Sequence, residues 1–157
     1  MKLFHGTNCD FHEINLLKSH KQKDFGQGFY LSDNREQALE MALHKVKQSG
    51  GEPYVQEYLF DEEALENPSL NILRFEGYTK EWVNFIIANR ENNSANPVHD
   101  YDIVIGPIAN DTVGVQLFQY RKRYINLDML IENLKYKRYT IQYFFGTSKA
   151  LSYLVRL

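Results

Sequence analysis

Hydrophobic and polar positions change period repeatedly along the chain, which predicts short strands alternating with helices. Runs rich in β-branched and aromatic residues, bounded by glycine or polar segments, are typical of strands. The predicted strands span residues 2–5, 29–32, 54–60, 71–75, 102–105 and 139–145. Residues 113–119 fit a strand or a short helix equally well, because their periodicity does not distinguish the two.

Helices are predicted where apolar residues recur three and four positions apart. The longest is expected from Asp33 to about Gln48, because Asp33 and Glu36 form a capping-box pattern and Gly50-Gly51 follows as a stop signal. Its expected sheet-facing side consists of Ala38, Met41, Ala42, Lys45 and Val46, with Leu39 and Leu43 beside them. The other predicted segments are a short acidic turn or helix at 61–66, helices at 79–89 and 127–136, the latter capped by Asn126, and a terminal helix capped by Thr147.

Together these elements predict one α+β domain over the full 157 residues. Hydrophobic residues make up 43% of the chain and aromatic residues 14%, which is enough to bury a core. The long polar connection 8–24 is expected to tuck Ile14, Leu16 and Leu17 against the body of the domain. The polar run 90–96 is the predicted mobile loop.

The net charge of the chain argues against a protein whose whole surface attracts nucleic acid or other anionic polymers. The net charge is −2 and the isoelectric point is about 6.2, so there is no overall basic field for nucleic acid or an anionic membrane. The basic run 121–123 is expected to be a solvated turn. No segment has the length of a membrane span, and the N-terminus lacks a signal-peptide apolar region. We therefore expect a soluble, cytoplasmic protein.

Cysteine and histidine add little candidate chemistry. The single cysteine, Cys9, excludes an internal disulfide and suits a reducing cytoplasm. It is expected to be a small buried residue, because no local signature marks it as a nucleophile. The five histidines are scattered without the paired spacing of zinc ligands, so no metal site is predicted.

Residues 23–33 contain the strongest candidate for a ligand site. Within them, residues 25–30 read Phe-Gly-Gln-Gly-Phe-Tyr. Glycine lets a backbone approach a ligand closely, and tyrosine presents a flat ring and a hydroxyl. A tight turn entering a strand explains the same pattern. A Rossmann dinucleotide loop does not, because no apolar strand precedes the segment, the third glycine is missing, and a strand follows in place of a helix.

Two further segments carry polar groups on predicted strands. His5-Gly6-Thr7 sets an imidazole beside a hydroxyl at a strand end, although a histidine that hydrogen-bonds a neighbouring turn explains it too. Gln142 lies within 139–145, where an ordinary outward-facing strand residue is the alternative. With residues 25–30, these segments resemble the ADP-ribosyltransferase superfamily, in the His-Tyr-Glu branch shared by poly(ADP-ribose) polymerases and diphtheria-type toxins. The chain looks most similar to small uncharacterised bacterial members of that branch with glutamine at the third position.

The resemblance implies an α+β fold of the ADP-ribosyltransferase type, a split β-sandwich with flanking helices. It also implies a mono-ADP-ribosyltransferase that takes NAD as substrate, needs no metal, releases nicotinamide and transfers ADP-ribose to an unidentified macromolecular acceptor. The implied catalytic residues are His5, Tyr30 and Gln142. The implied NAD-binding residues are His5, Gly6, Thr7, Phe25, Gly26, Gly28, Tyr30, Ala38 and Met41. A toxin-like role follows from the same resemblance, which leaves open whether an antitoxin-like protein partner exists.

The resemblance also assigns roles. His5 would hold ribose hydroxyls, the Gly6 backbone would pair with the nicotinamide carboxamide, and Tyr30 would lie against the nicotinamide ring. Ala38 and Met41 depart from the pattern of the polymerases, which have a serine and a second tyrosine at these positions.

Gln142 stands where the family has a glutamate. Hydrogen bonds to a charged partner contribute about 1.5–3 kcal/mol, whereas those between neutral groups contribute about 0.5–1.5 kcal/mol. Losing the charge is therefore expected to cost roughly 1–2 kcal/mol, or about 5- to 30-fold in rate. Chain extension is not expected, because an amide has no useful basicity. Two alternative functions remain: NAD hydrolysis without an acceptor, and inert binding of NAD or ADP-ribose.

Overall fold

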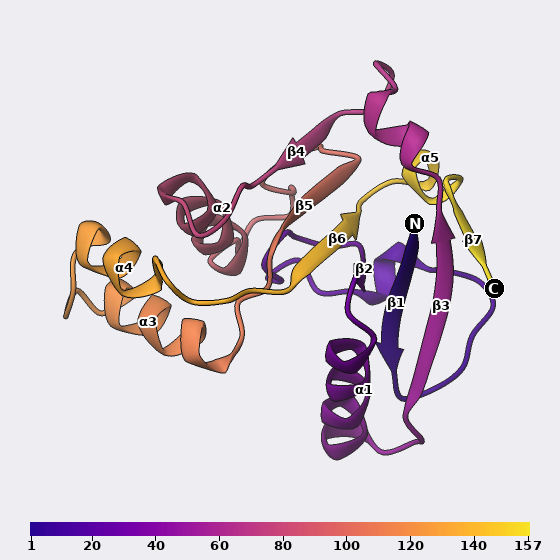
Figure 1. Ribbon diagram of the computed structural model, residues 1–157, viewed down its shortest axis with the longest axis horizontal. Helices are drawn as coiled ribbons and strands as arrows, with labels where there is room; N and C mark the ends of the chain where they lie inside the picture. Colours follow the sequence, from indigo (N-terminus) through magenta and orange to yellow (C-terminus); the bar gives the residue numbers. More distant parts are fainter.

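The computed structural model describes residues 1–157 and combines one seven-stranded mixed sheet with five α-helices (Figure 1). The strands are β1 (Lys2–Thr7), β2 (Phe29–Ser32), β3 (Tyr54–Phe60), β4 (Ile72–Arg74), β5 (Ile103–Pro107), β6 (Ile141–Phe145) and β7 (Leu154–Arg156). Their order in the sheet is β4-β5-β6-β2-β1-β3-β7, and only the β4–β5 pair is parallel. The chain is therefore α+β, as predicted.

Each helix begins at a side chain that caps its free N–H groups. The helices are α1 (Arg35–Ser49), α2 (Lys80–Arg90), α3 (Asp111–Arg121), α4 (Leu127–Leu134) and α5 (Ser148–Leu151), with 3₁₀ turns at Leu16–Lys18 and Glu62–Glu66. Their caps are Asn34, Thr79, Asn110, Asn126 and Thr147. Helix α1 ends at Gly50, whose φ of 76° suits a residue without a Cβ. None of the helices is both long and apolar enough to cross a membrane.

The sheet is divided at its centre. Strands β1 and β3 match along six residue pairs, and β2 and β6 along four. Between them, β1 and β2 are joined at a single pair, Phe4 opposite Ser32. Figure 1 accordingly shows β1, β3 and β7 side by side, with β4, β5 and β6 set at an angle to them. We call this weakly joined line between β1 and β2 the seam.

Two apolar clusters stabilise the two sides of the fold. One packs β1, β2 and β3 with the end of β6, around Leu3, Phe29 and Phe60. The other joins α2, α3 and α4 to β5 and β6 around Trp82, whose indole N–H donates to the Pro107 carbonyl at 3.1 Å. Tyr30 packs against the second cluster, so the candidate site borders this core.

Most predicted elements are confirmed. Of the two alternatives left open for residues 113–119, the structure has the helix, within α3. Several other details were wrong or missed, and strand β7 was not predicted. Asn34, not Asp33, caps α1, because its amide oxygen accepts from the N–H groups of Glu36 and Gln37 at 2.9 and 3.2 Å. Cys9 is exposed, not buried.

The predicted apolar face of α1 is confirmed in part. Ala38 and Ala42 are buried and Lys45 and Val46 are half-buried, but Leu39, Met41 and Leu43 are 37%, 40% and 45% exposed. Helix α1 lies so close to β1 that only small side chains fit between them. In the connection 8–24, Ile14 and Leu16 do pack against the core, but Leu17 is 78% exposed.

Candidate functional site

The three predicted catalytic residues lie on three neighbouring strands. His5 is in β1, Tyr30 in β2 and Gln142 in β6, and these strands are adjacent in the order β6-β2-β1. Tyr30 is opposite Phe144 and Ser32 is opposite Gln142. Because side chains alternate along a strand, Tyr30 and Gln142 point to the same face of the sheet. By the same alternation His5 belongs to the other face, and its ring lies at the seam.

His5 fills the gap where β1 and β2 separate. Its Nδ1 lies 2.7 Å from the Tyr30 carbonyl oxygen, and its ring centroid lies 4.4 Å from that of Phe29. A carbonyl can only accept, so Nδ1 carries the proton and Nε2 is left as a free acceptor. Burial, followed by the charge of Lys45, lowers the pKa of His5 to about 3. The imidazole is therefore neutral at pH 7.

The hydroxyl of Tyr30 is already hydrogen-bonded within the chain. The part of this side chain that could contact a ligand is therefore the face of its ring. The hydroxyl donates to the Gly26 carbonyl at 2.6 Å and accepts from the Phe25 N–H at 3.0 Å. Burial raises the pKa of Tyr30 well above its usual value. The ring packs edge-on against Phe144 at 5.3 Å, and the Lys23 ammonium lies 5.0 Å from the ring centroid.

The loop before β2 is rigidly held. Gly26 has a φ of 94°, and a Cβ on Gly28 would lie 2.3 Å from the Phe144 ring. The backbone of buried Phe25 is fixed by His99, whose Nε2 donates to the Phe25 carbonyl at 2.6 Å. His99 Nδ1 accepts from the Tyr101 N–H at 3.1 Å, which fixes its tautomer, and burial lowers the pKa of His99. Sequence reasoning missed His99, because nothing in its neighbours connects it with residues 25–30.

Gly6 is where α1 approaches β1 most closely. A Cβ at Gly6 would lie 1.9 Å from the Ala38 carbonyl oxygen, so the close approach requires glycine. The Gly6 carbonyl accepts a hydrogen bond from the Lys45 ammonium at 2.7 Å. Burial, followed by the charge of Lys23, lowers the pKa of Lys45 to about 8. Thr7 is buried, and its hydroxyl donates to the Cys9 carbonyl at 3.1 Å.

Two lysines that the sequence did not single out thus contact predicted site residues. Lys45 was assigned to the apolar face of its helix, and Lys23 to the polar connection. Neither forms an ion pair. Burial lowers the pKa of Lys23 as well. The available signal for Lys45 was its position on the same predicted helix face as Ala38 and Met41. That position indicates a charged group beside the sheet, but it was interpreted as part of a packing surface.

Gln142 is 8% exposed and held in one orientation. Its amide N–H₂ donates to the Pro107 carbonyl at 3.3 Å, and its amide oxygen makes no hydrogen bond within the chain. That oxygen is therefore available as an acceptor on the face that carries Tyr30. Ala38 is buried beneath Gly6, whereas Met41 is largely exposed one turn before Lys45.

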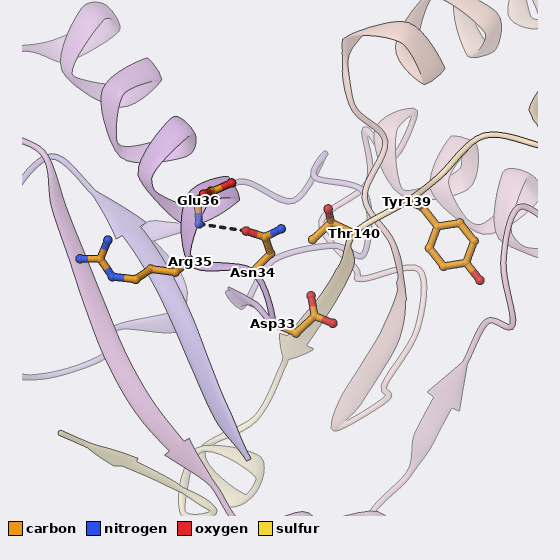
Figure 2. Close-up of a pocket in the computed structure, with 6 residues that line it drawn as sticks. All are labelled: Asp33, Asn34, Arg35, Glu36, Tyr139 and Thr140. Carbon is orange, nitrogen blue, oxygen red and sulfur yellow. Dashed lines mark hydrogen bonds between the residues drawn. The ribbon is translucent and has the colours of Figure 1, made fainter.

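A hollow on the surface lies elsewhere. It measures about 570 Å³ and is open, and Figure 2 shows its lining at the start of α1 and before β6, with Arg35 and Tyr139 pointing to opposite sides. The lining residues are Asp33, Asn34, Arg35, Glu36, Tyr139 and Thr140. None of the predicted site residues lines it, so this hollow is separate from the candidate site.

Stability is expected to fall as the pH decreases from 7 to 5. His5 and His99 have lowered pKa values in the folded chain, so below pH 6.5 the unfolded chain binds protons that the folded chain does not. His5 makes its full contribution to the free energy of unfolding above pH 6.5 and loses it as the pH falls toward 3. At pH 5 the loss amounts to about 1–2 kcal/mol. Urea unfolding at several pH values measures it. The free energy of unfolding should change less with pH in His5→Gln and in His99→Gln than in the wild type. An unchanged pH dependence in both variants would contradict the conclusion that these histidines stay neutral in the folded chain.

Comparison with known proteins gives one match. The family model described as "Protein of unknown function (DUF3990)" matches residues 1–155. No curated protein and no solved structure matches the chain.

Proposed function

We propose that this chain, which belongs to the DUF3990 family, is an NAD-dependent mono-ADP-ribosyltransferase. The supporting observation is that three segments far apart in sequence meet on adjacent strands. His5, Tyr30 and Gln142 lie on β1, β2 and β6, around a seam where the sheet is held by one residue pair. The same seam supports the split β-sandwich as the finer description of the fold.

The Tyr30 ring suits the cationic nicotinamide of NAD. A ring face attracts a cation within about 6 Å of its centroid, and Tyr30 already holds the Lys23 ammonium at 5.0 Å. A pyridinium ring placed there would gain the same attraction together with apolar contact. The Gly6 carbonyl, which now accepts from Lys45, would accept from the carboxamide N–H₂ in the same way.

The remaining groups suit the ribose. The free Nε2 of His5 and the free amide oxygen of Gln142 are both hydrogen-bond acceptors. Because His5 belongs to the other face of the sheet, a ribose that bonds to both would have to reach from the Tyr30 face into the seam. In the proposed reaction the bond between C1′ of the ribose and the nicotinamide nitrogen breaks, and nicotinamide leaves with the electron pair. An acceptor nucleophile then bonds to C1′ and loses a proton to solvent. The chain's contribution is to orient the ribose and to hold a partial negative charge near the oxocarbenium-like carbon.

An inert NAD- or ADP-ribose-binding module is the second candidate. The observation that favours it is the hydrogen bond from Gln142 to Pro107, because it fixes a neutral amide where the ADP-ribosyltransferases that the motifs resemble have a carboxylate. Incubation of the purified protein with NAD, followed by detection of free nicotinamide, separates the two. Release with labelling of a macromolecule from added cell lysate supports the transferase, and release without labelling indicates hydrolysis. The absence of release at measurable NAD binding would identify the inert module.

The ring of Tyr30 is expected to contribute directly to NAD affinity. Tyr30→Leu should weaken NAD binding by about 3- to 30-fold, since a cation–π contact contributes about 0.5–2 kcal/mol. Tyr30→Phe keeps the ring and should bind within about 3-fold of the wild type. Tyr136→Leu is the control, because Tyr136 is 85% exposed and lies just after α4, outside the motifs. Calorimetric titration with NAD measures the affinity of the wild type and of each variant. If folded Tyr30→Leu binds NAD as tightly as the wild type, the NAD site lies elsewhere.

A further inference from the structure

Lys23 and Lys45 occupy the two positions that the proposed function gives to nicotinamide. The Lys23 ammonium lies over the face of Tyr30, and the Lys45 ammonium donates to the Gly6 carbonyl. Both side chains are half-buried, and the charge of each lysine lowers the pKa of His5. The charge of Lys23 also lowers the pKa of Lys45, so the two ammonium groups lie within electrostatic range of each other.

No carboxylate forms an ion pair with either lysine. Asp24, next to Lys23 in sequence, raises the pKa of Lys23 by its charge, but its carboxylate is bound by Arg90 at 2.7 Å. Asp10, on the stretch after β1, is bound by Arg156. Two partly desolvated cations without an ion-pair partner are costly to hold together, because their mutual repulsion is weakly screened. The arrangement is therefore suited to an anion that the unliganded chain lacks.

We propose that Lys23 and Lys45 bind the diphosphate of the ligand, and that they leave the Tyr30 ring and the Gly6 carbonyl when the nicotinamide ring arrives. The identity of the ring rests on the proposed function, whereas the diphosphate contact does not depend on any reaction. Lysine suits this exchange because its ammonium is a compact charge on a flexible stem of four carbons. Each ammonium gives up a neutral partner, a ring face or a carbonyl, for a charge-assisted bond to phosphate oxygen.

Titrations with ligands that contain separate parts of NAD test the proposal. ADP-ribose and inorganic pyrophosphate carry the diphosphate without nicotinamide, and nicotinamide riboside carries the cationic ring without phosphate. Lys23→Gln and Lys45→Gln should each weaken binding of ADP-ribose and pyrophosphate by about 10-fold at low salt, since charge-assisted bonds are roughly twice as strong as neutral ones. Lys23→Gln should bind nicotinamide riboside as tightly as the wild type or more tightly, because the competing ammonium is gone.

Two further variants separate a local effect from a general one. Lys122→Gln also removes an ammonium that lies over an aromatic ring, that of Phe118 at 5.7 Å, but on the exposed end of α3. It should leave all three affinities unchanged. Lys45→Arg keeps the charge and should recover most of the ADP-ribose affinity lost in Lys45→Gln. Thermal melting of every variant confirms that the protein compared is folded.

The outcomes distinguish this proposal from the proposed function. Lysine-dependent binding of ADP-ribose without nicotinamide release would support the diphosphate contact and refute the transferase. Nicotinamide release with ADP-ribose affinities equal in wild type, Lys23→Gln and Lys45→Gln would overturn the contact and leave the transferase standing. The contact is also overturned if wild type binds neither ADP-ribose nor pyrophosphate, or if Lys122→Gln weakens both as strongly as the other two variants.

Discussion

Replacing Gly6 with alanine is expected to lower the free energy of unfolding by about 3 kcal/mol, the upper part of the usual range for overpacking. The new Cβ would lie 1.9 Å from the Ala38 carbonyl oxygen and 2.9 Å from the Ala42 nitrogen. Both are backbone atoms of α1, so no side-chain rotation can relieve the clash. The helix has to move away from β1, and the bond between Lys45 and the Gly6 carbonyl is lost with it. If the protein is a transferase, this displacement of α1 should also lower the rate of nicotinamide release.

Gly114→Ala is the matched control for this prediction. Gly114 lies inside α3, and a Cβ there would meet nothing within 4 Å. Because alanine favours a helix over glycine by roughly 0.5–1 kcal/mol, Gly114→Ala should stabilise the protein slightly. Urea unfolding of both variants measures the difference. If Gly6→Ala unfolds at the wild-type urea concentration, α1 does not pack against β1 as the structure has it.

Removing the side chain of Gln142 is expected to lower nicotinamide release by about 100-fold, the scale found when one group that stabilises a transition state is deleted. NAD affinity should change by less than about 3-fold, because the interaction strengthens only as positive charge develops on the ribose. The comparison needs single-turnover release and a calorimetric NAD titration of Gln142→Ala. A decrease in NAD affinity as large as the decrease in rate would make Gln142 a binding residue.

Gln142→Glu tests whether a negative charge at position 142 speeds nicotinamide release. A carboxylate would attract the oxocarbenium-like ribose, but one of its oxygens would face the Pro107 carbonyl, to which the glutamine N–H₂ now donates. A protonated carboxyl relieves that repulsion, so faster nicotinamide release than wild type is expected only as the pH rises and the group ionises. A rate equal to wild type at every pH, together with a wild-type rate in Gln142→Ala, would remove Gln142 from the site.

The strands and most helices could be predicted because their signals are local. Residues 29–32 and 54–60 match β2 and β3 to the residue, and Asn126 and Thr147 cap their helices as expected. Helix α1 shows the limit of such signals. Its large apolar residues are exposed, because what faces β1 is set by the close approach at Gly6 and not by the helix's own periodicity.

The candidate site was predicted only in its motif residues. His5, Tyr30 and Gln142 were identified by type and order, and the sheet does bring their strands together. Lys23, Lys45 and His99 were not assigned to the site, because their roles depend on contacts with Tyr30, Gly6 and Phe25 that become visible only in the folded chain. Likewise, the sequence could suggest that Gln142 replaces a carboxylate but not that the Pro107 carbonyl holds its amide.

The place of β6 beside β2 has a consequence for how the protein is made. During synthesis from the N-terminus, β1, β2 and β3 leave the ribosome long before β6, and β2 then has only its single pair with β1. An unpaired strand edge of this kind invites association with other chains until its own partner arrives. Because β6 also carries Gln142, a nascent chain cannot assemble the candidate site before residue 145 has been added and folded back. The late pairing delays both the protection of that edge and the onset of any activity to the same step.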